Sequence, residues 1–181
     1  MGGARRAHEL AWSLLAEPLP RRWSHTQGVA ATARRLEPIL GQDAELVEAA
    51  AWVHDIGYSP PLVDTRMHAL DGARYLRDVE RAEPLLCSLV AHHTGAIYEA
   101  HERGLDAVLT SEFDCPPDNL AKALTYCDVT TSPDGENIDV GERIDDILAR
   151  YEEGHPVNRT IRKARAYLLS SVKDIDALLM P

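Results

Sequence analysis

The spacing of hydrophobic residues along this chain indicates helices almost throughout. Apolar side chains recur at every third or fourth position, and the alternation of β-branched residues that is typical of strands is scarce. Prolines and glycines interrupt this pattern and mark the turns. The predicted helices span residues 4–16, 20–36, 43–56, 68–78, 83–93, 97–104, 118–130, 140–151 and 158–179. The fold class is therefore predicted to be all-α.

Residues at the ends of these segments refine the prediction. Asp43 and Asp118 are expected to be helix N-caps, because a short carboxylate accepts hydrogen bonds from the first free N–H groups of a helix. The pair Glu83-Pro84 suits a helix start, where the missing N–H of proline does no harm. The long interruptions at residues 57–67 and 131–139 are predicted to be loops.

Composition indicates one globular domain and excludes several classes of partner. The chain has 181 residues, of which 45% are hydrophobic and 27% charged, so it can bury one sizeable core. We expect a single domain over 1–181, with its core at about 20–131 and the terminal helices packed on it. The formal net charge of -10 argues against a nucleic-acid polymer as partner, so any phosphate site must be locally positive.

The cysteines and the hydropathy pattern favour the cytoplasm. Cys87, Cys115 and Cys127 are widely spaced and odd in number, which predicts neither a disulfide framework nor a zinc knuckle. No apolar run approaches the roughly 18 residues of a membrane span, and the N-terminus lacks the apolar stretch of a signal peptide. Whether the chain forms a homo-oligomer is left open.

The candidate chemistry centres on the dipeptide His54-Asp55, which closes an apolar helical run. Adjacent helical residues point about 100° apart, so both side chains can face one ion only if the helix ends there or the ion sits at its edge. Gly57 and the prolines at 60 and 61 supply such an ending. Other histidines and a carboxylate, the ligand types that suit Zn, Mn or Fe, occur at His25, His68, His92, His93 and Asp128.

Five segments in order resemble the signature of the HD-domain metal-dependent phosphohydrolases. The segments are Trp23-Ser24-His25-Thr26-Gln27-Gly28, Ala51-Trp52-Val53-His54-Asp55-Ile56-Gly57, His68-Ala69-Leu70-Asp71-Gly72-Ala73, His92-His93-Thr94-Gly95 and Leu124-Thr125-Tyr126-Cys127-Asp128. The resemblance covers roughly residues 21–131 and implies a helical HD-domain bundle. The additional histidines look like those of the two-metal branch, which includes bacterial diadenosine tetraphosphatases and cyclic-dinucleotide phosphodiesterases.

The resemblance implies a ligand set for one or two divalent transition-metal ions, Fe, Mn or Zn. The first ion is expected on His25, His54, Asp55 and Asp128. Asp55 is expected to bridge to a second ion held by His68 and His92. His93 is the alternative to His92 as ligand, or a substrate contact. We favour His92 because it stands one turn after Leu89 and three residues before Gly95.

Phosphoester hydrolysis needs a nucleophile at neutral pH and neutralisation of phosphoryl charge, and bound metal supplies both. Catalytic roles are expected for Asp55, His93 and Asp71, the last lying one helical turn after His68. Arg22 and Arg74 are the expected phosphate contacts, because a planar guanidinium matches pairs of oxygens. Both predicted loops leave from metal positions and are expected to form walls of the substrate pocket.

These features predict a metal-dependent phosphohydrolase acting on a small phosphorylated substrate, with a nucleotide favoured. A catalytically silent HD module that binds a nucleotide or a protein partner is the alternative. His8, His101 and His155 lie outside every matching segment, so no functional role is expected for them. Tyr58 follows the His-Asp motif, where family members often carry Lys.

Overall fold

The computed structural model describes residues 3–180, and its regular elements are all helical in that range, so the all-α prediction is confirmed. An isolated antiparallel bridge joins Thr131 to Asn137. The α-helices are α1 (Ala4–Leu15), α2 (Pro20–Arg35), α3 (Glu37–Leu40), α4 (Ala44–Val53), α5 (His68–Asp78), α6 (Pro84–His92), α7 (Ala96–Arg103), α8 (Asp106–Glu112), α9 (Asp118–Val129), α10 (Val140–Arg150) and α11 (Pro156–Leu179). Short 3₁₀ turns are η1 (Gly41–Asp43), η2 (Ile56–Tyr58), η3 (Pro60–Leu62) and η4 (His93–Gly95).

Each predicted helix has a counterpart in the structure, and the differences concern short helices and caps. The helices α3 and α8 were not expected, because four and seven residues are too few to show a helical repeat. Asp43 occupies the N-cap position of α4 as expected, but its side chain makes no capping bond. Asp118 is not an N-cap, because it is the first residue of α9, where it pairs with Lys122 at 2.7 Å. Pro84 begins α6 as expected.

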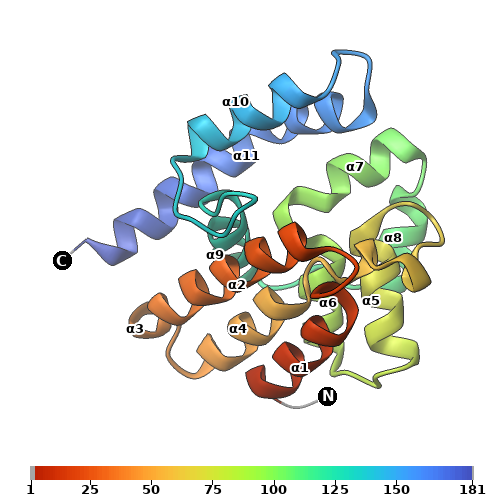
Figure 1. Ribbon diagram of the computed structural model, residues 1–181. Coiled ribbons are helices and arrows are strands. Elements are labelled where there is room, and N and C mark those ends of the chain that lie inside the picture. The colour runs from red at the N-terminus through yellow and green to blue at the C-terminus, as the bar shows by residue number, and fades with distance from the viewer. Residues whose placement is uncertain (1–2, 181) are drawn as a thin grey trace.

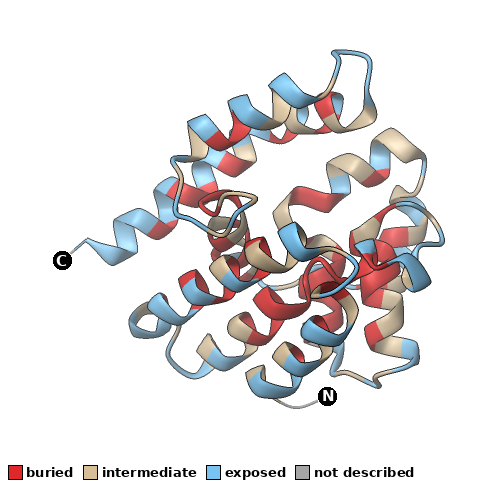
Figure 2. Cartoon of the chain, in the orientation of Figure 1, coloured by how far each residue is buried: buried red, intermediate tan, exposed pale blue. Residues whose placement is uncertain are grey.

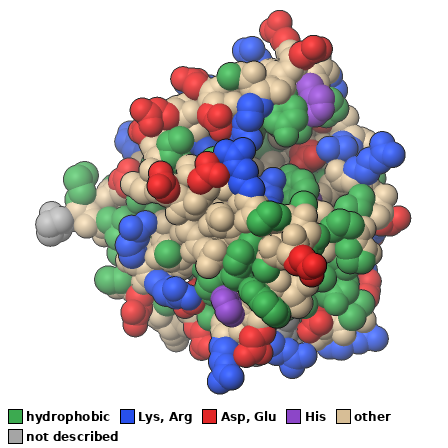
Figure 3. Space-filling model, in the orientation of Figure 1, with side chains coloured by type: hydrophobic (Ala, Val, Ile, Leu, Met, Phe, Trp, Pro, Cys, Tyr) green, Lys and Arg blue, Asp and Glu red, His purple; other side chains and the backbone are tan. Residues whose placement is uncertain are grey.

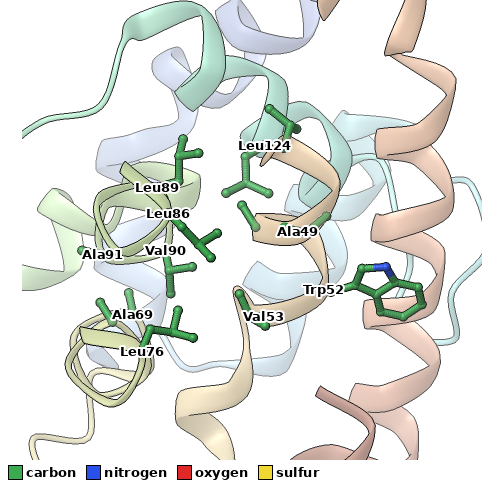
Figure 4. Packing of buried hydrophobic residues seen from close by; sticks show 14 of the residues in the cluster. Ala49, Trp52, Val53, Ala69, Leu76, Leu86, Leu89, Val90, Ala91 and Leu124 are labelled. Carbon is green, nitrogen blue, oxygen red and sulfur yellow. The ribbon is translucent and has the colours of Figure 1, made fainter. Parts of the chain in front are cut away.

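The main hydrophobic core surrounds α4, which packs against α1, α2, α6 and α9. Ala49, Ala50 and Ala51 are buried along α4, and their small side chains let the neighbouring helices approach. Figure 4 shows Val53 of α4 facing side chains of α5 and α6, with Leu124 of α9 above. Figure 2 shows the buried residues concentrated where these helices face one another.

The last two helices rest on a second, smaller apolar cluster. Its buried members are Val129, Ile144, Ala164, Leu168 and Val172. In Figure 1, α10 and α11 run side by side along one end of the molecule, and α11 also packs against α7. Among the described residues, no helix combines the length and apolar character needed to cross a membrane.

A close crossing of η2 and α5 joins the His-Asp turn to His68. A Cβ atom added to Gly57 would lie 2.0 Å from the carbonyl oxygen of His68 and 2.7 Å from the amide nitrogen of Gly72. No side chain fits in that space, so glycine at 57 allows the two segments to touch. This contact brings the residues after α4 against the first turn of α5.

Candidate metal centre

The end of α4 positions His54 and Asp55 together. The helix stops at Val53, His54 keeps near-helical dihedral angles of −57° and −34°, and Asp55 leaves the helix at −104° and 5°. Nε2 of His54 then lies 3.2 Å from Oδ2 of Asp55. The helix ends three residues before the predicted limit of residue 56, and both side chains face the same interior space.

Two groups of potential metal ligands meet at Asp55. His25 of α2, His54 and Asp128 of α9 form one group, and Asp55, His68 and His93 form the other. The ligand atoms of each group lie within 4.8 Å of one another. Oδ2 of Asp55 is 3.9 Å from Nε2 of His25, whereas Oδ1 is 3.4 Å from Nε2 of His68. The two oxygens of Asp55 therefore face different groups, which is the geometry of a bridging carboxylate.

Backbone carbonyls orient three of these imidazole rings. Nδ1 of His25, His54 and His93 lies within hydrogen-bond distance of the carbonyl oxygens of Ser132, Ala51 and Val90 respectively, at 2.9, 2.8 and 2.6 Å. A carbonyl only accepts, so each Nδ1 donates a proton to it, and Nε2 of each ring faces the cluster as the nitrogen that would bind an ion. This second contact is typical of histidines that bind metal.

The residues fit a divalent transition metal. Nε2 of His54 is buried and forms no hydrogen bond, although Oδ2 of Asp55 lies 3.2 Å away. A buried polar atom without a hydrogen bond is unfavourable, and a metal ion bound there would remove that cost. Imidazole nitrogens and carboxylate oxygens together suit Zn, Mn or Fe. All three ions accept both donor types.

Burial and neighbouring charges shift the pKa values of the residues in the cluster in different directions. Burial disfavours protonation of His54, but the carboxylates of Asp55 and Asp128 outweigh it and raise the pKa of His54 to about 9. Burial also lowers the pKa of His68 and of His93, so both rings are neutral at pH 7. Although burial opposes ionisation of Asp55, Arg22 and His54 hold its pKa well below the ordinary value.

Metal binding to the metal-free protein at pH 7 should release about one proton, because a pKa of about 9 leaves His54 protonated until an ion replaces that proton. Affinity should then rise roughly tenfold per pH unit between about pH 7 and 8.5 and level off above about 9. Calorimetric titration in buffers of different ionisation enthalpy measures the proton count. A count of zero would show that His54 is neutral before metal binds.

His92 is not in the cluster, so the structure corrects its expected position. It is the last residue of α6, and its Nε2 lies 3.0 Å from the carbonyl oxygen of Phe113. His93 follows the helix end, and its Nε2 lies 3.1 Å from Nε2 of His68. The chain leaves the helix at His93, and this turns the second histidine rather than the first toward Asp55.

The structure also contradicts the expected roles of Asp71 and Arg74. The carboxylate of Asp71 is buried and accepts hydrogen bonds from the amides of Asp64 and Thr65 and from the Thr65 hydroxyl, so it holds the loop before α5. Arg74 forms an ion pair with Glu112 at 2.5 Å. Neither residue lines the pocket described below.

Thr94 was not expected at the site. Its hydroxyl donates a short hydrogen bond to Oδ2 of Asp128, while its backbone has a left-handed φ of 51°. Such a conformation is strained for a β-branched residue and persists where the surroundings require it. No sequence signal marks a left-handed threonine, so only the structure reveals that Thr94 orients Asp128.

Arg22 meets the expectation of a basic residue at the site. Its Nη1 donates to Oδ2 of Asp55 at 2.8 Å, and its guanidinium lies over the ring of Tyr58 at 4.2 Å. Tyr58 stacks in turn on His68, with ring centroids 4.0 Å apart. Tyr58 therefore contacts both an arginine and a candidate ligand.

A pocket of about 620 Å³ opens onto the cluster. Tyr58, Arg66 and Pro133 of the two predicted loops line it, which confirms that these loops form its walls. Three carboxylates, those of Asp55, Glu99 and Asp128, also face the pocket. The arginines that line it are Arg21, Arg22, Arg66, Arg103, Arg143 and Arg150. Figure 3 shows basic side chains around the hollow between α10 and α2.

Comparison with protein families matches residues 22–132 to the HD domain. This match covers more than half of the chain and every residue of the cluster, so the protein belongs to the HD-domain family. Members of this family are generally metal-dependent hydrolases of phosphorylated compounds. Neither the comparison with curated proteins nor that with solved structures gave a match.

Proposed function

We propose that this protein is a metal-dependent phosphohydrolase that cleaves a phosphoester or phosphoanhydride of a small substrate, with two ions bridged by Asp55. The observation that carries the proposal is the concentration of arginines in the pocket beside the candidate ligands. Six arginines line it against three carboxylates, in a chain whose net charge is -10. Five of these guanidinium groups are paired with carboxylates, those of Arg21, Arg22, Arg103, Arg143 and Arg150. Guanidinium groups nevertheless outnumber the carboxylates that line the pocket, and this favours a phosphorylated ligand.

The size of the pocket favours a small molecule over a polymer. About 620 Å³ is within the range of roughly 300–1,000 Å³ typical of sites for small ligands. The acidic surface elsewhere opposes a long polyanion, which needs an extended basic track. A nucleotide or another phosphorylated metabolite fits both conditions.

Each residue near the cluster has a definable task in this proposal. Divalent metal, when bound, activates water and neutralises charge on phosphoryl oxygens. Arg22 is positioned to contact a phosphate oxygen, since it already lies against Asp55 at the floor of the pocket. Thr94 keeps the carboxylate of Asp128 in one orientation. His25 contacts Oδ1 of the same carboxylate at 3.0 Å.

No side chain in the pocket is suited to form a phosphoenzyme through sulfur. Cys127 is buried and burial raises its pKa, while Cys87 and Cys115 lie outside the pocket. We therefore propose direct hydrolysis, in which water supplies the oxygen that replaces the leaving group on phosphorus.

We expect the protein loaded with Mn, Fe or Zn to hydrolyse at least one compound in a panel of nucleotides and sugar phosphates. In labelled water under single-turnover conditions, one solvent oxygen should enter the phosphoryl product. Mass spectrometry of product and protein measures both the label and any covalent adduct. A trapped phosphorylated side chain would refute direct hydrolysis, and metal binding without any turnover would favour the silent binding module.

A further inference from the structure

Arg143 is the most buried of the arginines that line the pocket. Its side chain is 9% exposed, and it lies on α10, beyond the HD match at residues 22–132. Arg66 is exposed, so water solvates its charge. The side chains of the remaining four are 25% to 66% exposed, and these residues are Arg21, Arg22, Arg103 and Arg150. Because a buried cation loses its hydration, Arg143 needs a compensating anion more than the other five do.

Arg143 shares the one carboxylate that lies within ion-pair distance of it in the described part of the chain. Nη1 of Arg143 is 3.4 Å from Oδ2 of Asp146, whereas Nη2 of Arg150 donates to the same oxygen at 2.8 Å. The Asp146 side chain is itself 42% exposed. Asp146 therefore pairs mainly with Arg150 and balances the buried charge of Arg143 poorly.

Most of the hydrogen-bond donors of the Arg143 guanidinium are unused. A guanidinium carries five N–H donors, and the contact with Asp146 is the only hydrogen bond that this one makes among the described residues. None of its nitrogens is both sealed from solvent and without a partner. By contrast, Arg74 donates from two nitrogens to the carboxylate of Glu112, as a structural arginine should. The free N–H groups of Arg143 are thus open to a ligand in the pocket.

The charges around Arg143 change when the metal centre binds cations. Burial lowers the pKa of Arg143 below its ordinary value, Asp128 acts against this effect, and Arg150 and Arg22 add to it. Asp128 is a candidate metal ligand, and a bound divalent ion would offset its negative charge. Arg143 would then face a positively charged centre, and an anion between the two would be attracted by both.

We propose that Arg143 is a substrate-binding residue that α10 adds to the HD site, where its guanidinium contacts phosphoryl oxygens of the substrate beside the metal centre. The inference rests on the proposed function for the identity of the anion. A planar guanidinium can donate to two phosphoryl oxygens at once, and such charge-assisted bonds are about twice as strong as neutral ones. A structural arginine stabilises the fold, whereas Arg143 should lower the stability of the substrate-free protein, because its charge is buried before any anion compensates it.

Substitution of Arg143 by methionine tests the contact, since methionine keeps much of the aliphatic stem and removes the charge. The probe is methylenediphosphonate, titrated calorimetrically into the metal-loaded protein, with inorganic phosphate as a second probe. We expect Arg143→Met to weaken methylenediphosphonate binding by about ten- to a hundredfold. Arg143→Lys keeps the charge without the planar fork and should lose about three- to tenfold. Elemental analysis after each titration should show that both variants keep the metal content of the natural protein.

Thermal unfolding without phosphate separates this role from a structural one. Arg143→Met should raise the midpoint temperature of the metal-loaded protein by about 2 °C or more, whereas Arg143→Lys should not raise it. The gain should be smaller in metal-free protein, in which the charge of Asp128 still acts on the guanidinium. The control is Arg165→Met on α11, which removes an arginine outside the pocket that pairs with Asp145 at 3.8 Å. This control should alter neither the affinity nor the midpoint temperature by a measurable amount.

Three results would contradict the inference. Arg143→Met might bind methylenediphosphonate as tightly as the natural protein does, which would remove Arg143 from the substrate site. A natural protein that binds neither probe would do the same. A lower midpoint temperature of Arg143→Met, together with loss of metal, would assign Arg143 a structural role.

The outcomes also distinguish this inference from the hydrolase proposal. Turnover with unchanged kcat and KM in Arg143→Met would reject the contact and leave the hydrolase intact. Binding of methylenediphosphonate that depends on Arg143, without turnover under any metal, would keep the contact and reject the hydrolase.

Discussion

Asp55→Asn should lower turnover by at least about a thousandfold and reduce the metal content of the purified protein. The reason is the position of this carboxylate, whose two oxygens face the two candidate ligand groups. Asparagine has nearly the same shape as aspartate, but it is uncharged and has a single oxygen. It therefore lacks the second oxygen and the negative charge that a bridge between two cations needs. The measurements are steady-state kinetics and elemental analysis of protein purified without chelator.

The control for Asp55→Asn is His101→Ala. His101 is exposed on α7 and does not line the pocket, so its removal should change neither turnover nor metal content. Circular dichroism of both variants should match the natural protein, since the Asp55 side chain caps no helix. If Asp55→Asn retains full metal and activity, the bridging role is wrong.

The helical repeat and the His-Asp ending predict much of this architecture from the sequence. Gly57 after an apolar run indicates that α4 ends near His54, and the structure shows the helix ending at Val53. Long helices can be predicted from the sequence because their buried faces impose a repeat of apolar residues. The convergence of His25 and Asp128 on that turn depends on tertiary packing, and only the family resemblance anticipates it.

The predicted site roles that the structure does not support fail for identifiable physical reasons. Asp71 lies one turn after His68, but the loop before α5 returns to bond its carboxylate. Arg74 lies six residues after His68, a rotation of about 240° on a helix, which turns it away from the ligand face. The arginine and aromatic residues of α10 and α11 follow the HD match, so no motif announces them. His155, expected from its sequence context to have no function, lines the pocket.

The adjacent histidines at the end of α6 provide the sharpest test of the second ligand group. His93→Ala should remove one of the two nitrogen ligands predicted for the second ion, lower metal content from two ions toward one, and reduce turnover by about a hundredfold or more. His92→Ala should leave metal content unchanged, because His92 faces the carbonyl of Phe113 instead of Asp55. Elemental analysis and kinetics compare the two variants directly.

The helix end explains why two neighbours should behave so differently. His92 still belongs to α6, whereas His93 has an extended ψ of 148° and precedes the left-handed Thr94. Loss of the His92 hydrogen bond should lower the free energy of unfolding by about 1 kcal/mol, measured by denaturant titration, without affecting the ions. The reverse pattern, with metal lost from His92→Ala and kept in His93→Ala, would restore His92 as the ligand. If the natural protein holds one ion and neither variant changes activity, the centre holds a single metal on His25, His54, Asp55 and Asp128.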